Sequence, residues 1–350
     1  MKIPMKIGIL NVQVPFIRGG AEVLAESLRD ELKKRGHDAD IITIPFKWYP
    51  PEKIVDSMMV ARKIDVTEVN GEKIDRVIAL KFPVYLANHE NKVLWLCHQH
   101  RQAYELWGTD HGDLHAMEFG DEVRKLIVDC DNRFLPKSRK IFTISKTVSD
   151  RLMQFNSISS IPLYPPPKNP EIFRAETSQD YIFYPSRIDK IKRQILLVSA
   201  LKFCKTRIRV IIAGTGDQRT INDIRERAKT DGTLSRLEIR GYVSEEEKAD
   251  LYAKSLGVYF GAYQEDYGYI TLESFYSGKP VIIHTDAGGP SEFVNEKNGF
   301  IIKPEPQEIA FVMDSLYNDR EHAKNLGNQG YELIQNLNIN WDYVIRQLVS

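Results

Sequence analysis

Residues 257–284 read GVYFGAYQEDYGYITLESFYSGKPVIIH, with one short apolar run on each side of a helical pattern. The pattern predicts strands over 257–260 and 280–284 and a helix over 270–277. A strand, a helix and a second strand in such close succession form a βαβ unit, in which the two strands are parallel. The segment therefore favours an α/β fold built on parallel sheets.

The same alternation continues on both sides of this segment. In the second half of the chain it predicts strands over 181–184, 209–213 and 237–240 and helices over 191–203, 219–230 and 245–253. In the first half it predicts strands over 6–12, 39–44, 76–80, 93–97 and 140–144 and helices over 21–35 and 146–155. We therefore expect two Rossmann-like domains, each a doubly wound parallel sheet, that face a cleft.

A proline-rich segment separates the two halves. Residues 161–170 read IPLYPPPKNP, and proline cannot continue a helix or a central strand. We expect a first domain over 1–161, a linker over 162–170 and a second domain over 171–335. The remaining residues, 336–350, are expected to carry a short helix that packs back toward the first domain.

Composition limits the possible partners. A chain of 350 residues that is 42% hydrophobic can bury two cores. Lys plus Arg equals Asp plus Glu, 48 each, so no net positive field attracts nucleic acid. The three cysteines, Cys97, Cys130 and Cys204, form no CxxC pair. We expect them to pack in the core rather than to bind zinc or form a disulfide framework.

The sequence favours a cytoplasmic location. The first residues lack the apolar run and the cleavage site of a signal peptide, and no apolar stretch of about 18 residues is present. Residues 44–53 mix aromatic with basic side chains. They suit either packing over the first domain, which we favour, or peripheral contact with the inner membrane face. The oligomeric state stays open.

The opening stretch carries candidate binding residues directly after a strand. Glu265 lies in the loop, and Gly268 allows a close backbone approach before the helix over 270–277. Amides at a helix N-terminus favour an anion such as a phosphate. Glu273, one turn inside the helix, is suited to accept hydrogen bonds from a ribose diol. Alternatively, both glutamates are solvated charges.

Residues 265–282 resemble the E-x7-E signature of glycosyltransferase family 4, a family of retaining enzymes with the GT-B fold. Other segments resemble family motifs in the same order. Residues 184–192, with Arg187 and Lys192, resemble the G-R-x4-K segment, and residues 288–292, GGPSE, also fit. The resemblance extends over the chain and is most specific over 181–303. It implies transfer of a hexose from a nucleotide diphosphate sugar to a hydroxyl acceptor, in glycan or glycolipid biosynthesis, without a metal or cofactor.

The resemblance also implies which residues bind the donor. They are Gly19, Gly20, Gly214, Gly216, Val243, Gly268, Tyr269, Ile270, Thr271 and Glu273. A departing nucleoside diphosphate gains negative charge, which either a metal or fixed cations stabilise. No Asp-x-Asp triplet stands at a predicted strand end, so Arg187 and Lys192 are assigned this role. The alternative is that both are ordinary surface cations.

The first domain is expected to contribute a histidine. Gly19 and Gly20 open the helix over 21–35, but they form neither a dinucleotide fingerprint nor a Walker loop. The family has a histidine beside the transferred sugar, and His98 is the favoured counterpart, with His100 as the alternative. Glu265 would hold sugar hydroxyls. Residues 107–119 are expected to form a polar acceptor loop.

Two questions have alternative answers: which base the donor carries, and whether the chain is a catalyst. Guanine and uracil donors share the same diphosphate site, and the phrase Leu163-Tyr-Pro-Pro resembles mannosyltransferases, which tilts the choice toward GDP-mannose over a UDP sugar. From another class, the chain would be a catalytically silent subunit that binds a nucleotide sugar. No segment resembles the pyridoxal phosphate site of the phosphorylases that share the fold.

Overall fold

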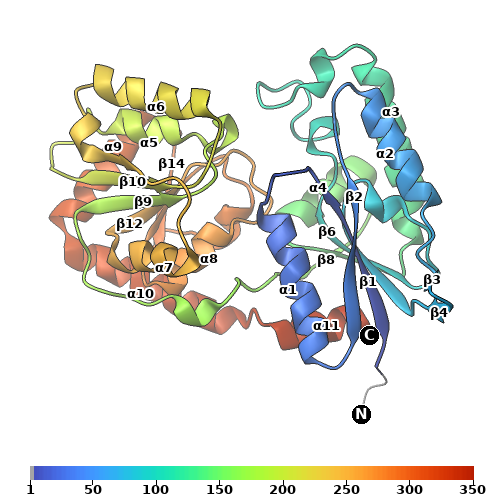
Figure 1. Cartoon of the computed structure of the whole chain (residues 1–350). Helices are drawn as coiled ribbons and strands as arrows, with labels where there is room; N and C mark the ends of the chain where they lie inside the picture. Colours follow the sequence, from blue (N-terminus) through green and yellow to red (C-terminus); the bar gives the residue numbers. More distant parts are fainter. Residues whose placement is uncertain (1–3) are drawn as a thin grey trace. The chain divides into compact units, whose positions relative to one another are not determined.

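The computed structural model describes residues 4–350, which divide into two compact units (Figure 1). The first unit runs to Lys168 and also contains Asn340–Ser350, and the second unit is Asn169–Ile339. The chain thus passes from the first unit to the second inside the proline-rich segment. Each unit is built on one six-stranded sheet.

All strand pairs in the sheet of the first unit are parallel. In sheet order the strands are β2 (Asp38–Pro45), β1 (Lys6–Gln13), β5 (Arg76–Lys81), β6 (Lys92–His98), β7 (Lys140–Thr143) and β8 (Ile161–Pro162). The helices are α1 (Gly20–Lys34), α2 (Glu52–Lys63), α3 (Gly120–Phe134), α4 (Lys146–Asn156) and α11 (Trp341–Val349). A small hairpin joins β3 (Glu68–Val69) to β4 (Glu72–Lys73).

The sheet of the second unit is also parallel throughout. In sheet order the strands are β11 (Leu237–Ile239), β10 (Arg209–Ala213), β9 (Tyr181–Pro185), β12 (Gly257–Phe260), β13 (Val281–His284) and β14 (Gly299–Ile302). The helices are α5 (Gln194–Ala200), α6 (Gln218–Thr230), α7 (Glu245–Lys254), α8 (Tyr269–Tyr276), α9 (Pro306–Asn318) and α10 (Arg320–Leu337). Helices α5, α6 and α9 cover one face and α7, α8 and α10 the other (Figure 1). The strand order reverses between β9 and β12, and such switch points are where doubly wound sheets bind ligands.

Apolar spacing explains why these elements form. Leu24, Leu28 and Leu32 recur every four residues along α1, and each is at most 2% exposed. Burying one leucine side chain contributes about 2 kcal/mol. Helix α1 ends before Gly36, whose φ of +82° is the left-handed conformation that glycine adopts without strain. Helix α4 begins as predicted, because the Ser145 hydroxyl accepts from the amide of Val148.

Helix α11 returns to the first unit after the whole second unit. Its Trp341 ring packs edge-on against Trp95, with 6.2 Å between ring centroids. Asp342 pairs with Arg35, and the buried Arg76 donates to the carbonyl of Leu348 at 2.8 Å. The helix is therefore an integral part of the first unit's fold.

Two local predictions need correction. The helix predicted over 191–203 is interrupted at Arg193, whose φ is +54°, so that a short 3-10 helix at Lys190–Lys192 precedes α5. The proline-rich segment is not only a linker, because Ile161–Pro162 forms β8 at the sheet edge. An edge strand tolerates proline since one of its sides makes no ladder hydrogen bonds.

The structure also bears on the aromatic and basic segment 44–53, on the three cysteines and on whether any helix could span a membrane. Trp48, in the aromatic and basic segment 44–53, donates to Asp113 of the segment 107–119 at 3.1 Å, whereas Tyr49 is half exposed. All three cysteines are free, and Cys97 is buried while the other two are half-buried. Within residues 4–350, no helix is both long enough and apolar enough to cross a membrane.

We predict that Leu348→Ala destabilises the first unit, because Leu348 is fully buried where α11 packs. The expected loss in the free energy of unfolding is about 2–5 kcal/mol. The matched control is Tyr343→Ala on the same helix, at a side chain that is 46% exposed, for which the loss stays below about 1 kcal/mol. Urea unfolding followed by tryptophan fluorescence measures both. A loss from Leu348→Ala as small as that from Tyr343→Ala would show that α11 does not stabilise the unit.

Candidate functional site

Most predicted donor-site residues of the second unit lie at one edge of its sheet. Because the strands are parallel, the loops after β9, β10, β12 and β13 meet at their carboxyl ends. Backbone pairing joins these loops: Ile188 bridges Gly216, and Glu265 bridges Gly288. The amide of Gly214 donates to the carbonyl of Gly241 at 2.7 Å. The loops therefore form one connected surface.

The glycines of the loop after β10 serve this packing. A Cβ at Gly214 would lie 2.0 Å from the carbonyl oxygen of Ser186, and one at Gly216 would lie 2.4 Å from that of Ile188. Both distances are far below a van der Waals contact. The GxG pattern is thus required where the loops after β9 and β10 touch.

The structure brings Lys192 and Glu265 together as an ion pair. Their side chains are 17% and 21% exposed, so the pair is shielded from solvent without being buried. Arg187 is more open, with 48% of its side chain exposed, and its guanidinium lies 3.5 Å from Asp189. Two of the predicted charged residues therefore contact each other, and the third has a side chain that extends into solvent.

Glu273 is held by residues that the sequence analysis did not identify. Its carboxylate accepts from the Tyr252 hydroxyl at 2.8 Å and from Lys248 at 3.0 Å, both on α7. Burial disfavours the charged form of Lys248, but the carboxylates of Glu273 and Glu245 outweigh burial and raise its pKa. Each carboxylate oxygen has a second acceptor position. Glu273 is thus fixed in place and retains acceptor capacity for a ligand.

The start of α8 contains an unsatisfied polar group. Gly268 precedes the helix with φ of +88°. Thr271 is fully buried, and its hydroxyl has no hydrogen-bond partner among residues 4–350. Buried polar groups without partners are uncommon in native proteins. Of the other predicted residues here, Tyr269 begins the helix, while Ile270 packs with Val243 against the core beside Phe173.

Arg193 is a further residue that the sequence analysis did not identify. Its guanidinium makes two hydrogen bonds to Asp286, at 2.9 and 2.6 Å, and one to the carbonyl of Gly261 at 2.6 Å. Burial raises the pKa of Asp286, but hydrogen bonding to Arg193 outweighs burial and the pKa lies below its usual value. The amide of Glu265 also donates to the Ala287 carbonyl at 2.7 Å. Arg193 therefore fixes the two loops that position Glu265.

In the first unit, the predicted residues also follow strands. Gly19 precedes α1 and Gly20 begins it, directly after the loop from β1. The amide of Gly19 donates to Glu22 at 2.8 Å, and Glu22 pairs with Lys81. Burial raises the pKa of Glu22, but Lys81 outweighs it, so the pKa lies below normal. One amide at this helix start is therefore already bound to a carboxylate.

The two histidines differ in their surroundings. His100 is buried against the Phe82 ring, with 5.2 Å between ring centroids, and its Nε2 has no hydrogen-bond partner among the described residues. Burial, followed by the charge of His98, lowers the pKa of His100 to about 3. His98 is half-buried at the end of β6, and its Nδ1 lies 2.6 Å from the Gln99 carbonyl. Its greater exposure makes His98 the more accessible of the two.

Across residues 4–350, no three His, Cys, Asp or Glu side chains gather in a way that could hold a metal ion. The polar groups at the carboxyl edge of the second sheet are cations, paired carboxylates and helix amides. This set suits an anionic ligand that also carries hydroxyl groups.

Comparison with known proteins finds a family resemblance in the second unit. Residues 167–333 match the family described as glycosyl transferases group 1. The chain is 22% identical to an uncharacterized glycosyltransferase of Methanocaldococcus jannaschii, over 99% of this chain and 97% of that protein. It is 25% identical to an alpha-1,3/1,6-mannosyltransferase of Dictyostelium discoideum, but over only 33% of this chain and 27% of that protein.

The fold has solved counterparts. The structure of HepE from Anabaena in complex with UDP and glucose matches with a TM-score of 0.69 at 17% identity, over 99% of this chain and all of that one. The likeness confirms the expected GT-B architecture of two Rossmann-like units.

We predict that Arg193→Asn loosens the loops at 261–268 and 285–289. Asn tolerates the left-handed backbone at this position but cannot replace the hydrogen bonds to Asp286 and Gly261. Loss of charged hydrogen bonds of about 2 kcal/mol corresponds to roughly thirtyfold faster amide exchange in a locally opening loop. Hydrogen–deuterium exchange with mass spectrometry measures this.

The control for this prediction is Arg187→Asn, because the Arg187 side chain is exposed and its ion pair is with Asp189, in its own loop. Exchange in the same two loops is expected to remain at the wild-type rate. If Arg193→Asn also left the exchange unchanged, Arg193 would not be the residue that fixes the position of Glu265.

Proposed function

We propose that the chain is a retaining, metal-independent glycosyltransferase that moves a hexose from a nucleotide diphosphate sugar to a hydroxyl acceptor, in glycan or glycolipid biosynthesis. The proposal is supported by the family match over residues 167–333 and by the type of residues at the carboxyl edge of the second sheet. The observation that carries it is the Lys192–Glu265 pair beside the start of α8.

These residues suit the charge that develops during the reaction. As the bond between the anomeric carbon and the diphosphate breaks, the leaving group gains negative charge. Lys192 has three N–H donors, so it can hold Glu265 and a phosphate oxygen together. The Arg187 guanidinium and the amides at the start of α8 are further donors. Cations fixed before the reaction stabilise the leaving group without reorganising.

The proposed route retains the configuration of the sugar. The acceptor oxygen bonds to the anomeric carbon on the face that the diphosphate leaves, and the acceptor proton passes to a phosphate oxygen. No protein base is then required. Glu265, fixed by Lys192 and by the loop that Arg193 holds, would bind sugar hydroxyls rather than attack. His98, the more accessible histidine, would lie beside the transferred sugar.

The donor would be GDP-mannose or a UDP sugar. The partial likeness to a mannosyltransferase favours GDP-mannose, whereas UDP is the nucleotide in the similar HepE structure. In either case Glu273 would accept hydrogen bonds from the ribose, because Lys248 and Tyr252 fix its carboxylate and leave acceptor positions open.

We predict that Lys192→Ala lowers turnover by on the order of a hundredfold, as for loss of one transition-state charge partner. The expected result for Arg187→Ala is similar. Lys190→Ala is the matched control, because this exposed lysine lies two residues away, and it should retain wild-type turnover. Release of nucleoside diphosphate from a panel of nucleotide sugars and acceptors measures the rate. Wild-type turnover in both Lys192→Ala and Arg187→Ala would refute the leaving-group role.

We also predict that one nucleoside diphosphate binds in the presence of EDTA and that Glu273→Gln weakens its binding about tenfold, the effect of losing roughly 1.4 kcal/mol. Calorimetry with UDP, GDP, ADP and TDP measures this. Glu245→Gln is the control, because Glu245 also pairs with Lys248 but its side chain is 48% exposed.

Binding that required a divalent metal would contradict the metal-independent mechanism. Selective binding without turnover of any nucleotide sugar would instead favour a silent nucleotide-sugar-binding subunit. If Glu273→Gln bound the selected nucleotide as tightly as the wild type, Glu273 would not contact the ribose.

A further inference from the structure

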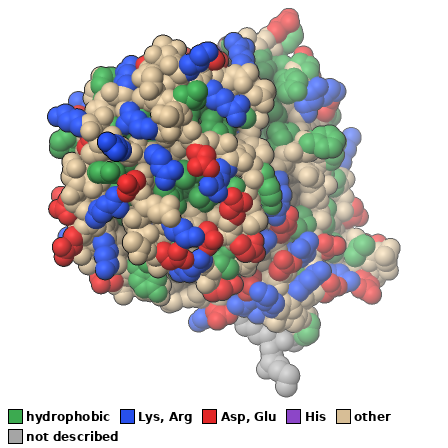
Figure 2. Space-filling view, turned by 60° about the vertical axis from the view of Figure 1, so that its left-hand side comes forward, with side chains coloured by type: hydrophobic (Ala, Val, Ile, Leu, Met, Phe, Trp, Pro, Cys, Tyr) green, Lys and Arg blue, Asp and Glu red, His purple; other side chains and the backbone are tan. Residues whose placement is uncertain are grey.

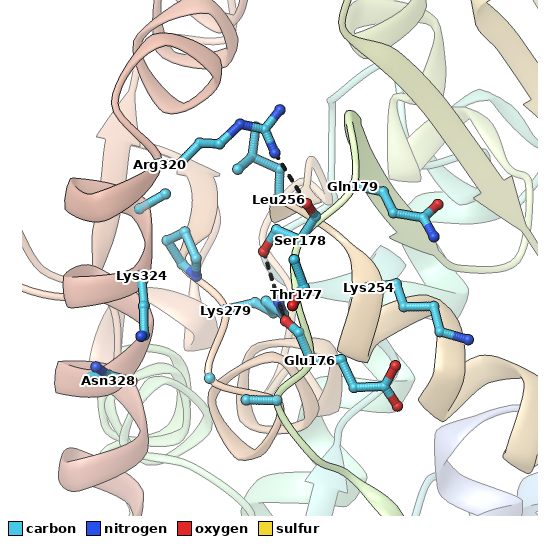
Figure 3. Close-up of a pocket in the computed structure, with 14 residues that line it drawn as sticks. Glu176, Thr177, Ser178, Gln179, Lys254, Leu256, Lys279, Arg320, Lys324 and Asn328 are labelled. Atoms are coloured by element: carbon cyan, nitrogen blue, oxygen red, sulfur yellow. Dashed lines mark hydrogen bonds between the residues drawn. The ribbon is translucent and has the colours of Figure 1, made fainter.

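The second unit contains a pocket, which Figure 3 shows. It lies at the amino edge of the sheet, whereas the candidate site lies at the carboxyl edge. It has a volume of about 800 Å³, within the range of small-molecule sites. Its lining residues lie just before β9, β12 and β13 and on α10: residues 175–179, Lys254, Leu256, residues 278–280, Arg320, Ala323, Lys324 and Asn328. Strands of four or five residues at about 3.3 Å each place this pocket roughly 15 Å from the carboxyl edge.

Cations dominate the charged groups of this pocket. Lys254, Lys279, Arg320 and Lys324 line it, against the single carboxylate of Glu176. That carboxylate pairs with Arg174 outside the pocket, at 2.7 Å. The lining of the pocket therefore carries an excess of positive charge. On the face of the molecule that Figure 2 shows, Lys and Arg side chains lie among Asp and Glu side chains.

Lys279 is the most buried of these cations, at 3% exposure. Its ammonium donates to the carbonyl of Glu176 at 3.0 Å and to the hydroxyl of Ser178 at 2.9 Å, both neutral acceptors. Burial lowers the pKa of Lys279 to about 8, and the charge of Glu176 offsets only part of this effect. An ammonium buried without a paired anion is costly. An anion bound in the pocket would supply the missing countercharge.

The other cations retain capacity to bind an anion. Lys324 is exposed and makes no ion pair with any carboxylate of residues 4–350. The Lys254 ammonium lies 3.8 Å from Asp250, a loose pair on a side chain that is 39% exposed. Arg320 is engaged by Asp180 and by the Ser178 carbonyl. Lys254 and Lys324 are thus the cations of the pocket best able to bind an anionic ligand.

We propose that this pocket binds a small molecule that carries phosphate groups, a nucleotide or a sugar phosphate, at a site separate from the donor site. Phosphate oxygens accept from several ammonium and guanidinium groups at once. The remaining walls, formed by Leu256, Pro280, Ala323 and Ala175, offer apolar surface to the body of such a molecule. The assignment stands independently of the proposed transferase activity, since it rests on residues at the opposite edge of the sheet.

The pocket is tested by calorimetric titration of inorganic pyrophosphate into the full chain carrying Lys192→Ala, which removes a cation of the carboxyl edge. One binding event is expected. Lys254→Ala combined with Lys324→Ala in the same background should weaken it at least tenfold. The matched control is Lys205→Ala with Lys229→Ala, which removes two charges from exposed lysines elsewhere in the unit. The control should keep the affinity within about twofold, because exposed charges at a distance are screened.

Two results would overturn the assignment. One is the absence of pyrophosphate binding in the Lys192→Ala protein. The other is equal weakening by the pocket pair and by the control pair, which would reduce the effect to net charge. Because the lysines of the pocket pair and of the control pair are exposed or half-exposed, thermal unfolding should show these variants to be as well folded as the Lys192→Ala protein. Competition by a nucleoside monophosphate or by a hexose phosphate then distinguishes the two sources of the phosphate group.

Discussion

Parallel pairing of β9 with both β10 and β12 is the constraint on which the second unit depends. All strands of this sheet enter from one edge and leave at the other, so every loop that follows a strand ends on the same side. The loops from β9, β10, β12 and β13 are bonded to one another there, and the glycines at positions 214 and 216 allow their backbones to touch. A reversed strand would move one loop, and its charged residues, to the far edge.

Charge in this region is arranged as fixed pairs. Glu265 pairs with Lys192, Glu273 with Lys248 and Asp286 with Arg193. Partly buried ion pairs add little net stability, since desolvation offsets much of their attraction. Their effect here is on geometry, because each carboxylate is held in one direction by its cation. The pocket at the amino edge differs, because the buried Lys279 has only neutral acceptors.

The sequence predicted most of the fold because local patterns determine it. Short apolar runs identified the central strands, and leucines at four-residue spacing identified α1. The sequence analysis did not predict helix α10, because its packing face contains Gly327 and Gly330, and glycine inside a helical pattern resembles a helix breaker. A Cβ at Gly327 would lie 2.0 Å from the Gly278 carbonyl oxygen, and one at Gly330 would lie 2.2 Å from the Phe275 ring. These glycines allow close helix packing, a tertiary reason that no local pattern contains.

The same limit applies to the candidate site. The motif positions Glu265, Glu273 and Lys192 stand close to strand ends and were identified directly. Their supports were not, because Arg193 finds Asp286 only across 93 residues of chain. The left-handed backbone at Arg193 is likewise set by distant partners. Tyr252 and Lys248 come from α7, where they look like ordinary helix residues. Motif spacing therefore identifies the residues that would face a ligand, and the structure is needed to find those that hold them.

The return of α11 to the first unit has a consequence for the order of folding during synthesis. Domains generally fold as units as the chain emerges from the ribosome. The second unit, Asn169–Ile339, is synthesised without interruption and has all its strands before α11 appears. The strands of the first unit are synthesised earlier. However, the buried Arg76 can bind the carbonyl of Leu348, and the Trp95 ring can pack against Trp341, only after α11 has been synthesised. The unit that is translated first is therefore the one whose core is completed last.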